Sequence, residues 1–251
     1  MRIENRASLR FAILNSVFSM LNSSASASEM TRKRALRTLE NTLRRLGFHR
    51  IAGVDEVGRG CLAGPVMAAA VVLHPARHIS ALSDSKQIGA PERERLSAEI
   101  MRRAEGWAVG VAESDEIDRL NIHRASLTAM RRAVLALDPL PDLVLVDAFR
   151  IPDLWMAQCA VLHGDVRCAA IAAASIVAKV TRDRRMLVLH AEDPRYGFDR
   201  HKGYATADHL AAVSRFGYSA VHRRTFRPPS LFDTLTHDEL DEDAGDILQS
   251  T

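Results

Sequence analysis

Residues 51–66 read IAGVDEVGRGCLAGPV and join a strand pattern to an acidic pair and a glycine-rich turn. Apolar Ile51 and Val54 predict a buried strand that ends in two adjacent carboxylates, Asp55 and Glu56. Buried carboxylates are costly unless their charge is compensated, and a bound cation is a common compensation. Successive strand residues face opposite ways, so one acid is expected as a direct ligand, while the other bends toward the site or acts through water. The alternative is a strand followed by a solvated turn.

The turn after this strand contains Gly58, Arg59 and Gly60, and the pair Gly64-Pro65 follows. Glycines on both sides of Arg59 let the backbone approach a ligand closely, and a guanidinium suits phosphate or sugar oxygens. The turn therefore predicts a contact with a phosphate or a sugar beside the acidic pair.

The composition describes a globular chain with a basic body. Its 251 residues, 47% of them hydrophobic and 26% charged, are enough for a sizeable core, so we expect one main domain with attachments. Seven of the 31 acidic residues lie within 233–246, which leaves residues 1–232 with 34 basic and 24 acidic residues, a net charge of +10. A basic body suits a polyanionic partner such as nucleic acid.

Cysteine content and hydropathy bear on the compartment. Cys61, Cys159 and Cys168 are an odd number without zinc-type spacing, which fits a reducing cytoplasm and no structural metal. No apolar run is long enough to span a bilayer. We therefore expect a soluble, cytoplasmic protein with no membrane partner.

An N-terminal extension precedes the first strand. Residues 1–28 combine three arginines, an apolar stretch and a serine-alanine run, which resembles a targeting segment. The alternative, which we favour, is a disordered extension or an upstream start codon. Residues 29–48 predict a basic amphipathic helix that docks on the body or is solvated, in preference to one that touches nucleic acid. Its apolar face carries Leu36, Leu39, Leu43 and Leu46.

The rest of the chain alternates between apolar runs and helical periodicity. Residues 83–103 predict a loop followed by a helix, and further helices are predicted at 121–137 and 168–190. Strands are predicted at 50–57, 68–73, 107–114, 142–148 and 155–165. Three early strands followed by strands alternating with helices indicate an α/β fold with a mixed sheet and helices on both faces.

Two further acids end predicted strands. Asp147 closes the apolar run LVLVDA, and Asp165 follows the next run in the sequence HGD. If these strand ends meet at one edge of the sheet, they converge with Asp55 and Glu56, and four unneutralised acids would repel strongly. All-oxygen ligands select Mg²⁺ or Mn²⁺, and two such ions are suited to phosphodiester hydrolysis. For each single Asp, the alternative is a turn or a helix cap.

The sequence also resembles the ribonuclease HII family over most of residues 50–230. Beyond IAGVDEVGRG, the resemblance rests on DSK (84–86), NIHRASLTAM (121–130), AAASIVAKVTRDR (172–184), YGFDRHKGYATADH (196–209) and HRRTFRP (222–228). It implies a ribonuclease H-like mixed β-sheet flanked by helices, with a small helical C-terminal region. Two positions depart from the family pattern: Cys61 stands where Pro is usual, and Ala148 where Gly often follows the strand Asp.

The resemblance also assigns roles to residues. The metal-binding and catalytic carboxylates would be Asp55, Glu56, Asp147 and Asp165, holding two Mn²⁺ or Mg²⁺ ions. Substrate binding would fall to Gly58, Arg59, Gly60 and Tyr204. The first three would sense the 2′-hydroxyl and phosphates at an RNA–DNA junction, and the Tyr204 ring would pack on the sugar of the following deoxynucleotide.

The implied activity is endonucleolytic. It would hydrolyse the RNA strand of RNA–DNA hybrids and nick duplex DNA 5′ of single embedded ribonucleotides, leaving 3′-hydroxyl and 5′-phosphate ends. The expected partners are RNA–DNA hybrid and ribonucleotide-containing duplex DNA, and a monomer is expected. The alternatives are another nuclease of the same fold, such as a junction resolvase or a type I ribonuclease H, and a nucleic-acid-binding protein with a degenerate site.

The predicted organisation has four parts. Residues 1–49 form the extension, 50–190 the catalytic core, 191–232 a helical substrate-binding region, and 233–251 an acidic tail that competes for the basic face. The side chains of Lys86, Lys179, Arg182 and Lys202 are expected to contact phosphates, or else to be solvated or ion-paired. Asp183 is predicted to be a structural ion-pair acid.

Overall fold

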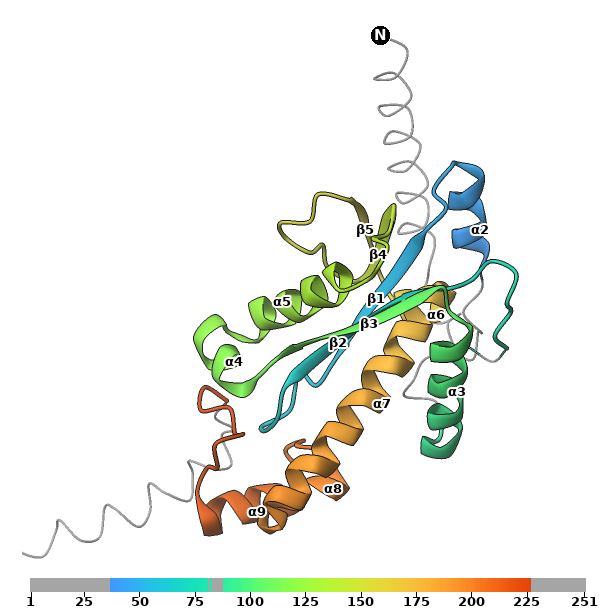
Figure 1. Cartoon of the computed structure of the whole chain (residues 1–251). Coiled ribbons are helices and arrows are strands. Elements are labelled where there is room, and N and C mark those ends of the chain that lie inside the picture. The colour runs from blue at the N-terminus through green and yellow to red at the C-terminus, as the bar shows by residue number, and fades with distance from the viewer. Residues whose placement is uncertain (1–36, 81, 83–87, 227–251) are drawn as a thin grey trace, which may run out of the picture.

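The computed structural model describes residues 37–80, 82 and 88–226, and Figure 1 shows their arrangement. Within these residues the strands form one five-stranded mixed sheet, in the order β3-β2-β1-β4-β5. Strand β1 pairs antiparallel with β2 on one side and parallel with β4 on the other. The strands are β1 (Ile51–Val57), β2 (Val66–Val72), β3 (Gly106–Ala112), β4 (Leu143–Asp147) and β5 (Ala157–Val161).

Helices cover both faces of this sheet, as the sequence predicts. The described α-helices are α2 (Thr38–Arg45), α3 (Ala90–Arg103), α4 (Ser114–Leu120), α5 (Ile122–Leu135), α6 (Gly164–Arg167), α7 (Ala169–Glu192), α8 (Phe198–His201) and α9 (Ala207–Phe216), and a 3₁₀ turn, η2, spans Pro194–Tyr196. The predicted strand over 155–165 is wrong at its end. Strand β5 stops at Val161, His163 adopts the left-handed conformation with φ 54°, and helix α6 then starts.

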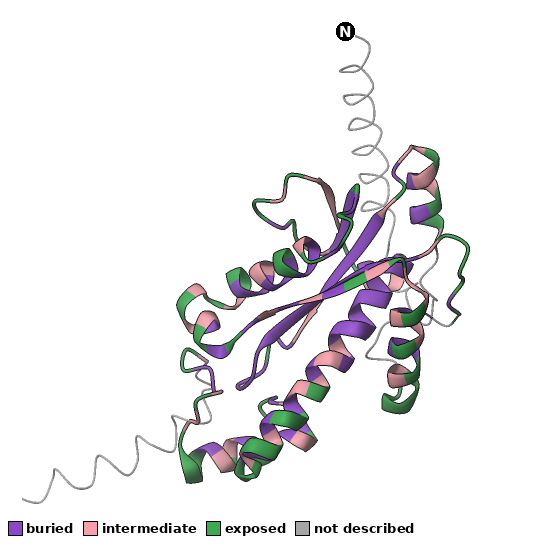
Figure 2. Cartoon of the chain, viewed as in Figure 1, coloured by how far each residue is buried: buried purple, intermediate pink, exposed green. Residues whose placement is uncertain are grey.

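The alternation of strand side chains divides the apolar residues into two cores. One core joins Ile51, Leu143 and Leu145 to α7, and the other joins Val54 and Val146 to α5. Strands β1, β2 and β4 are therefore buried on both faces of the sheet, as Figure 2 shows for β1 and β2. This explains why β2 reads as an unbroken apolar run rather than as an alternating one.

Helix α7 lies unusually close to strand β1 because of one glycine. A Cβ atom at Gly53 would lie 2.1 Å from the backbone carbon of Ala170 and 2.3 Å from the nitrogen of Ile171. A larger residue at this position would push the helix off the sheet. Gly53 therefore fixes the distance between the first turn of α7 and the strand that carries the acidic pair.

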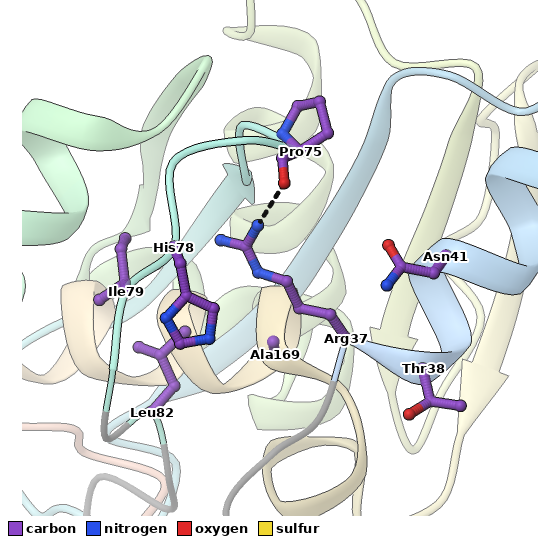
Figure 3. A pocket seen from close by; sticks show the side chains of 8 residues that line it. All are labelled: Arg37, Thr38, Asn41, Pro75, His78, Ile79, Leu82 and Ala169. Carbon is purple, nitrogen blue, oxygen red and sulfur yellow. Dashed lines mark hydrogen bonds between the residues drawn. The ribbon is translucent and has the colours of Figure 1, made fainter.

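Helix α2 docks on the body, which is one of the two alternatives for the predicted basic helix. Leu39 and Leu43 are buried in the α7-side core, and the Glu40 carboxylate accepts a 2.9 Å hydrogen bond from the Ala170 backbone at the start of α7. Arg37 donates to the carbonyls of His74 and Pro75, the second of which is drawn in Figure 3. The cavity of about 360 Å³ beside Arg37 contains none of the predicted site residues.

A third core holds the C-terminal helical region against the far end of α7. It is formed by Ala63, Met186, Leu189, Tyr196, Phe198 and Val213. In the described part of the chain no helix is long and apolar enough to cross a membrane. The predictions for residues 1–36, Lys86 and the acidic tail lie outside the described residues.

Candidate active site

Strands β1 and β4 carry two of the predicted acids to the same edge of the sheet. Val54 pairs with Val146 in parallel register, and the next residues along these strands are Asp55 and Asp147. Because alternate residues face opposite sides, both acids lie on the α7 side. There the Ser175 hydroxyl of α7 hydrogen-bonds to Asp55, which is 7% exposed. The structure thus places Asp55 and Asp147 on neighbouring strands and on the same face.

Burial and mutual repulsion raise the pKa values of the acidic pair. Burial raises the pKa of Asp55 well above its usual value, and the charges of Glu56 and Asp147 raise it further. Burial also raises the pKa of Glu56, although the Arg59 guanidinium, 3.4 Å from its Oε1, opposes this rise. Three acids therefore repel one another in a place with little water. A divalent cation would relieve that repulsion, so the oxygen donors present fit such an ion.

Asp165 reaches this region from helix α6 and not from a strand end. Its neighbour Gly164 donates its backbone N–H to Oδ1 of Asp147 at 2.8 Å, so the start of α6 lies directly against Asp147. Asp165 itself is half-buried. Among the described residues no three His, Cys, Asp or Glu side chains are already gathered closely enough to hold a metal ion. Asp55, Glu56 and Asp147 therefore lie near one another, but the described structure does not present the four acids as a preassembled metal site.

A buried arginine, to which the sequence motifs assigned no role, hydrogen-bonds to the backbone of the glycine-rich turn. Arg223 is fully buried and donates to the carbonyl oxygens of Gly58 at 2.6 Å, Arg59 at 2.8 Å and Gly64 at 2.8 Å. Its guanidinium thus fixes the backbone of the turn, while the Arg59 side chain pairs with Glu56. Gly58 has φ 91°, and a Cβ atom there would lie 2.2 Å from Nε of Arg182.

Arg182 is fully buried, so the prediction that it contacts phosphates or lies in solvent is wrong. It donates to the carbonyls of Pro65 and Lys202 at 2.9 Å and of Ala63 at 3.2 Å. It therefore ties the turn after β1 to the segment that carries Tyr204. Helical spacing contained the signal, because Ala178, Arg182 and Met186 form one buried stripe of α7.

Tyr204 stands at the edge of this region with 41% of its surface exposed. The Lys179 ammonium lies 5.9 Å from the centre of its ring, and Lys179 also pairs with Asp183 at 2.6 Å. Burial raises the pKa of Tyr204, and the neighbouring Cys61 adds to this. Asp183 also faces Arg93 at 3.8 Å, so it is an ion-pair acid as predicted, although its partners differ from the adjacent arginines.

Two buried histidines connect the C-terminal region to the backbone of Tyr204. The backbone N–H of Ser219 donates to Nδ1 of His222, so Nε2 of His222 carries the proton and donates to Nε2 of His209 at 3.0 Å. Nδ1 of His209 then donates to the carbonyl of Tyr204 at 2.9 Å. This relay requires both rings to be neutral, and burial lowers the pKa of each to about 4.

We expect the stability of the protein to fall between pH 7 and pH 5 because of these two rings. Below pH 6.5 the two histidines are protonated in the unfolded chain but stay neutral in the folded protein. The folded state therefore loses stability as the pH falls toward 4. The loss at pH 5 is about 2–4 kcal/mol for the pair. Urea unfolding at several pH values measures it.

The matched variants are His222→Gln, which removes one titrating ring, and His49→Gln at an exposed position. His222→Gln should lower stability at pH 7.5 and flatten the pH dependence, whereas His49→Gln should change neither. Because buried acids with raised pKa values change stability in the opposite sense, the wild type must be compared with His222→Gln, and equal pH dependence of the two proteins would contradict the relay.

Comparison with known proteins identifies the family of this chain. The family model for ribonuclease HII matches residues 52–228. A ribonuclease HII of Pelotomaculum thermopropionicum is 50% identical over 204 residues, covering 80% of this chain and 77% of the relative. One of Nitrosococcus oceani is 54% identical over 183 residues, covering 73% of this chain and 91% of the relative. The ribonuclease H2 structure of Pyrococcus horikoshii shares the fold, with TM-score 0.63 and 24% identity over 76% of this chain and 99% of that one. The chain therefore belongs to the ribonuclease HII family of metal-dependent ribonuclease H endonucleases.

Proposed function

We propose that this chain hydrolyses the RNA strand of RNA–DNA hybrids and nicks duplex DNA on the 5′ side of a single embedded ribonucleotide. The products carry 3′-hydroxyl and 5′-phosphate ends, and the role is ribonucleotide removal from DNA. The observation that carries the proposal is continuity: β1 bears Asp55 and Glu56 and runs directly into the turn of Gly58 and Arg59. The same turn is bonded to the Tyr204 segment, since Leu62 donates its backbone N–H to the Gly203 carbonyl at 2.8 Å.

The proposed metal ligands are Asp55, Glu56, Asp147 and Asp165. Their carboxylate oxygens favour Mg²⁺ or Mn²⁺ over softer metals. Two such ions, when bound, would supply an activated water and neutralise charge on the phosphate and the leaving oxygen. The protein holds the acids in place through Ser175 at Asp55 and the Gly164 backbone at Asp147.

Recognition is assigned to the turn and to the C-terminal region, residues 191–232. Arg59 lies beside Glu56, so a phosphate or 2′-hydroxyl that it contacts sits next to the acids. The exposed ring of Tyr204 offers a flat surface for a sugar, and Lys179 beside it offers a positive charge for a phosphate. A 2′-hydroxyl distinguishes RNA from DNA, so a reader placed here would locate the cut at a ribonucleotide.

The test uses duplex DNA with one ribonucleotide, incubated with the full chain and Mg²⁺ or Mn²⁺. We expect a single nick 5′ of the ribonucleotide, no cut in the same duplex made of DNA alone, and no product in chelator. Denaturing gel electrophoresis beside synthetic markers with 3′-hydroxyl ends identifies the bond that is cut.

Other results would favour the rival functions. Cleavage of long RNA–DNA hybrids without a nick at a single ribonucleotide would indicate type I specificity. Tight binding of both substrates without cleavage in either metal would indicate a nucleic-acid-binding protein. Cleavage of four-way DNA junctions alone would indicate a resolvase.

We further propose that the chain acts as a monomer in the cytoplasm. Cys61, Cys159 and Cys168 are all free in the structure, which suits a reducing compartment. Size-exclusion chromatography with light scattering measures the molar mass with and without substrate, and the mass of a single chain is expected in its absence.

A further inference from the structure

A strained turn follows the strand that ends in Asp147. Ala148 has φ 59°, a left-handed conformation that a residue with a Cβ atom rarely adopts. The backbone N–H of Phe149 donates to the carbonyl of Asp147 at 2.7 Å, so the chain reverses within three residues. Strained backbone at the end of a site strand is retained when it orients a side chain that the site uses. The side chain oriented here is Phe149.

The ring of Phe149 is exposed and faces the arginine of the glycine-rich turn. It is 43% exposed, and the guanidinium carbon of Arg59 lies 5.5 Å from its centre. His123 of α5 packs its ring edge-on against Phe149, with centroids 5.1 Å apart at 81°. The ring thus makes two directed contacts, although it is not part of the core.

Arg59 therefore has two neighbours that pull in different ways. The Glu56 carboxylate, 3.4 Å from Nη1, attracts it toward the acids, and the Phe149 ring, whose centre lies 5.5 Å from the guanidinium carbon, attracts the same group by a cation–π contact. An arginine side chain is long, and a single weak ion pair does not fix its plane. A second contact, with the Phe149 ring, restricts the guanidinium further and so favours one orientation toward an incoming phosphate or hydroxyl.

We propose that Phe149 is a positioning residue that holds Arg59 in the orientation that reads the ribonucleotide. This rests on the proposed role of Arg59 in substrate recognition. Phe149 itself needs no contact with the reacting atoms. Its effect on cleavage should therefore pass entirely through Arg59.

A double-mutant cycle tests this on duplex DNA with one ribonucleotide. Phe149→Ala should lower kcat/KM by roughly two- to fivefold, as expected for losing an exposed cation–π contact. In the Arg59→Ala background the same change should have little further effect. Phe149→Tyr keeps the ring and should retain wild-type activity, whereas Phe149→Leu keeps only apolar bulk and should behave like Phe149→Ala. Trp155→Ala is the matched control, an aromatic on the same loop that is 72% exposed.

The proposal is overturned if Phe149→Ala and Arg59→Ala act additively, or if Phe149→Leu is as active as Phe149→Tyr. The melting temperatures of the Phe149 variants should stay within about 2 °C of that of the wild type, because the Phe149 ring lies largely at the surface. If the wild-type chain cleaves hybrids but not the single-ribonucleotide duplex, the proposed function fails instead. The same cycle measured on hybrids then still decides the role of Phe149.

Discussion

Replacing Asp55 by Asn should lower the rate of cleavage by about a thousandfold and at the same time stabilise the metal-free protein. The loss follows because a neutral amide is a poor ligand for a divalent cation, whose contribution is several kcal/mol at the transition state. The gain follows because the pKa of Asp55 is raised in the folded state. Its ionised form is then more costly folded than unfolded, so at every pH above its unfolded pKa the charge destabilises the fold.

Cleavage kinetics in Mn²⁺ and thermal melting in chelator measure the two effects. The melting temperature of the variant in chelator should lie above that of the wild type, and the difference should shrink as the pH is lowered toward 4, where the wild-type acid is neutral as well. Asp115→Asn is the matched control, because this acid is exposed and paired only with Arg119 in the described structure. A D55N protein that melts below wild type in chelator would show that the acids do not repel as inferred.

Replacing Arg223 by Met should destabilise the protein by about 4 kcal/mol or more and abolish cleavage even where the fold survives. The buried guanidinium satisfies the carbonyls of Gly58, Arg59 and Gly64, and each buried acceptor left without a donor costs about 1–3 kcal/mol. Burial lowers the pKa of Arg223 to about 10, which shows that its charge is only partly compensated. The contribution of Arg223 to the stability of the fold therefore comes from the hydrogen bonds that it donates.

Urea unfolding and the cleavage assay test this prediction together. Arg223→Lys keeps the charge but offers fewer, differently placed donors, so it should recover only a small part of the stability. Arg224→Ala is the matched control, since Arg224 is exposed and only its backbone N–H bonds to Asp118. Equal stability of Arg223→Met and Arg224→Ala would mean that the turn is held by other contacts.

The fold was predictable because its signals are local. Period-two and period-3.6 patterns identify the strands and helices, and the unbroken apolar run before Asp147 identifies a strand buried on both faces. The end of β5 was not predictable from such patterns, because the left-handed residue is His163 and not the adjacent Gly164, which instead begins helix α6. Asp165 was therefore expected on a strand and lies on a short helix.

The support around the site was not predictable, since it depends on acceptors far away in sequence. Arg182 and Arg223 bond to carbonyl oxygens 117 to 165 residues away, apart from Lys202, and a carbonyl leaves no mark in the sequence. Both arginines lie in basic motifs that would equally suit phosphate contacts. The hydrogen bond between His209 and His222 could not be predicted for the same reason, because no pattern in the sequence around either residue indicates a contact between them.

Helix α7 gives the site a rigidity that has a consequence for the nucleic acid. Its first turns contact β1 and Asp55, and its later turns hold Arg182 and the C-terminal region, so one continuous helix of 24 residues joins the proposed metal ligands to the proposed substrate-binding region. A helix of this length is about 36 Å long and bends little. The distance between the proposed metal ligands and the proposed substrate-binding region is then fixed by the protein. Any change of shape on binding must therefore occur in the nucleic-acid duplex. Cutting rates should therefore follow the flexibility of the base steps that flank the ribonucleotide, even where no side chain touches them.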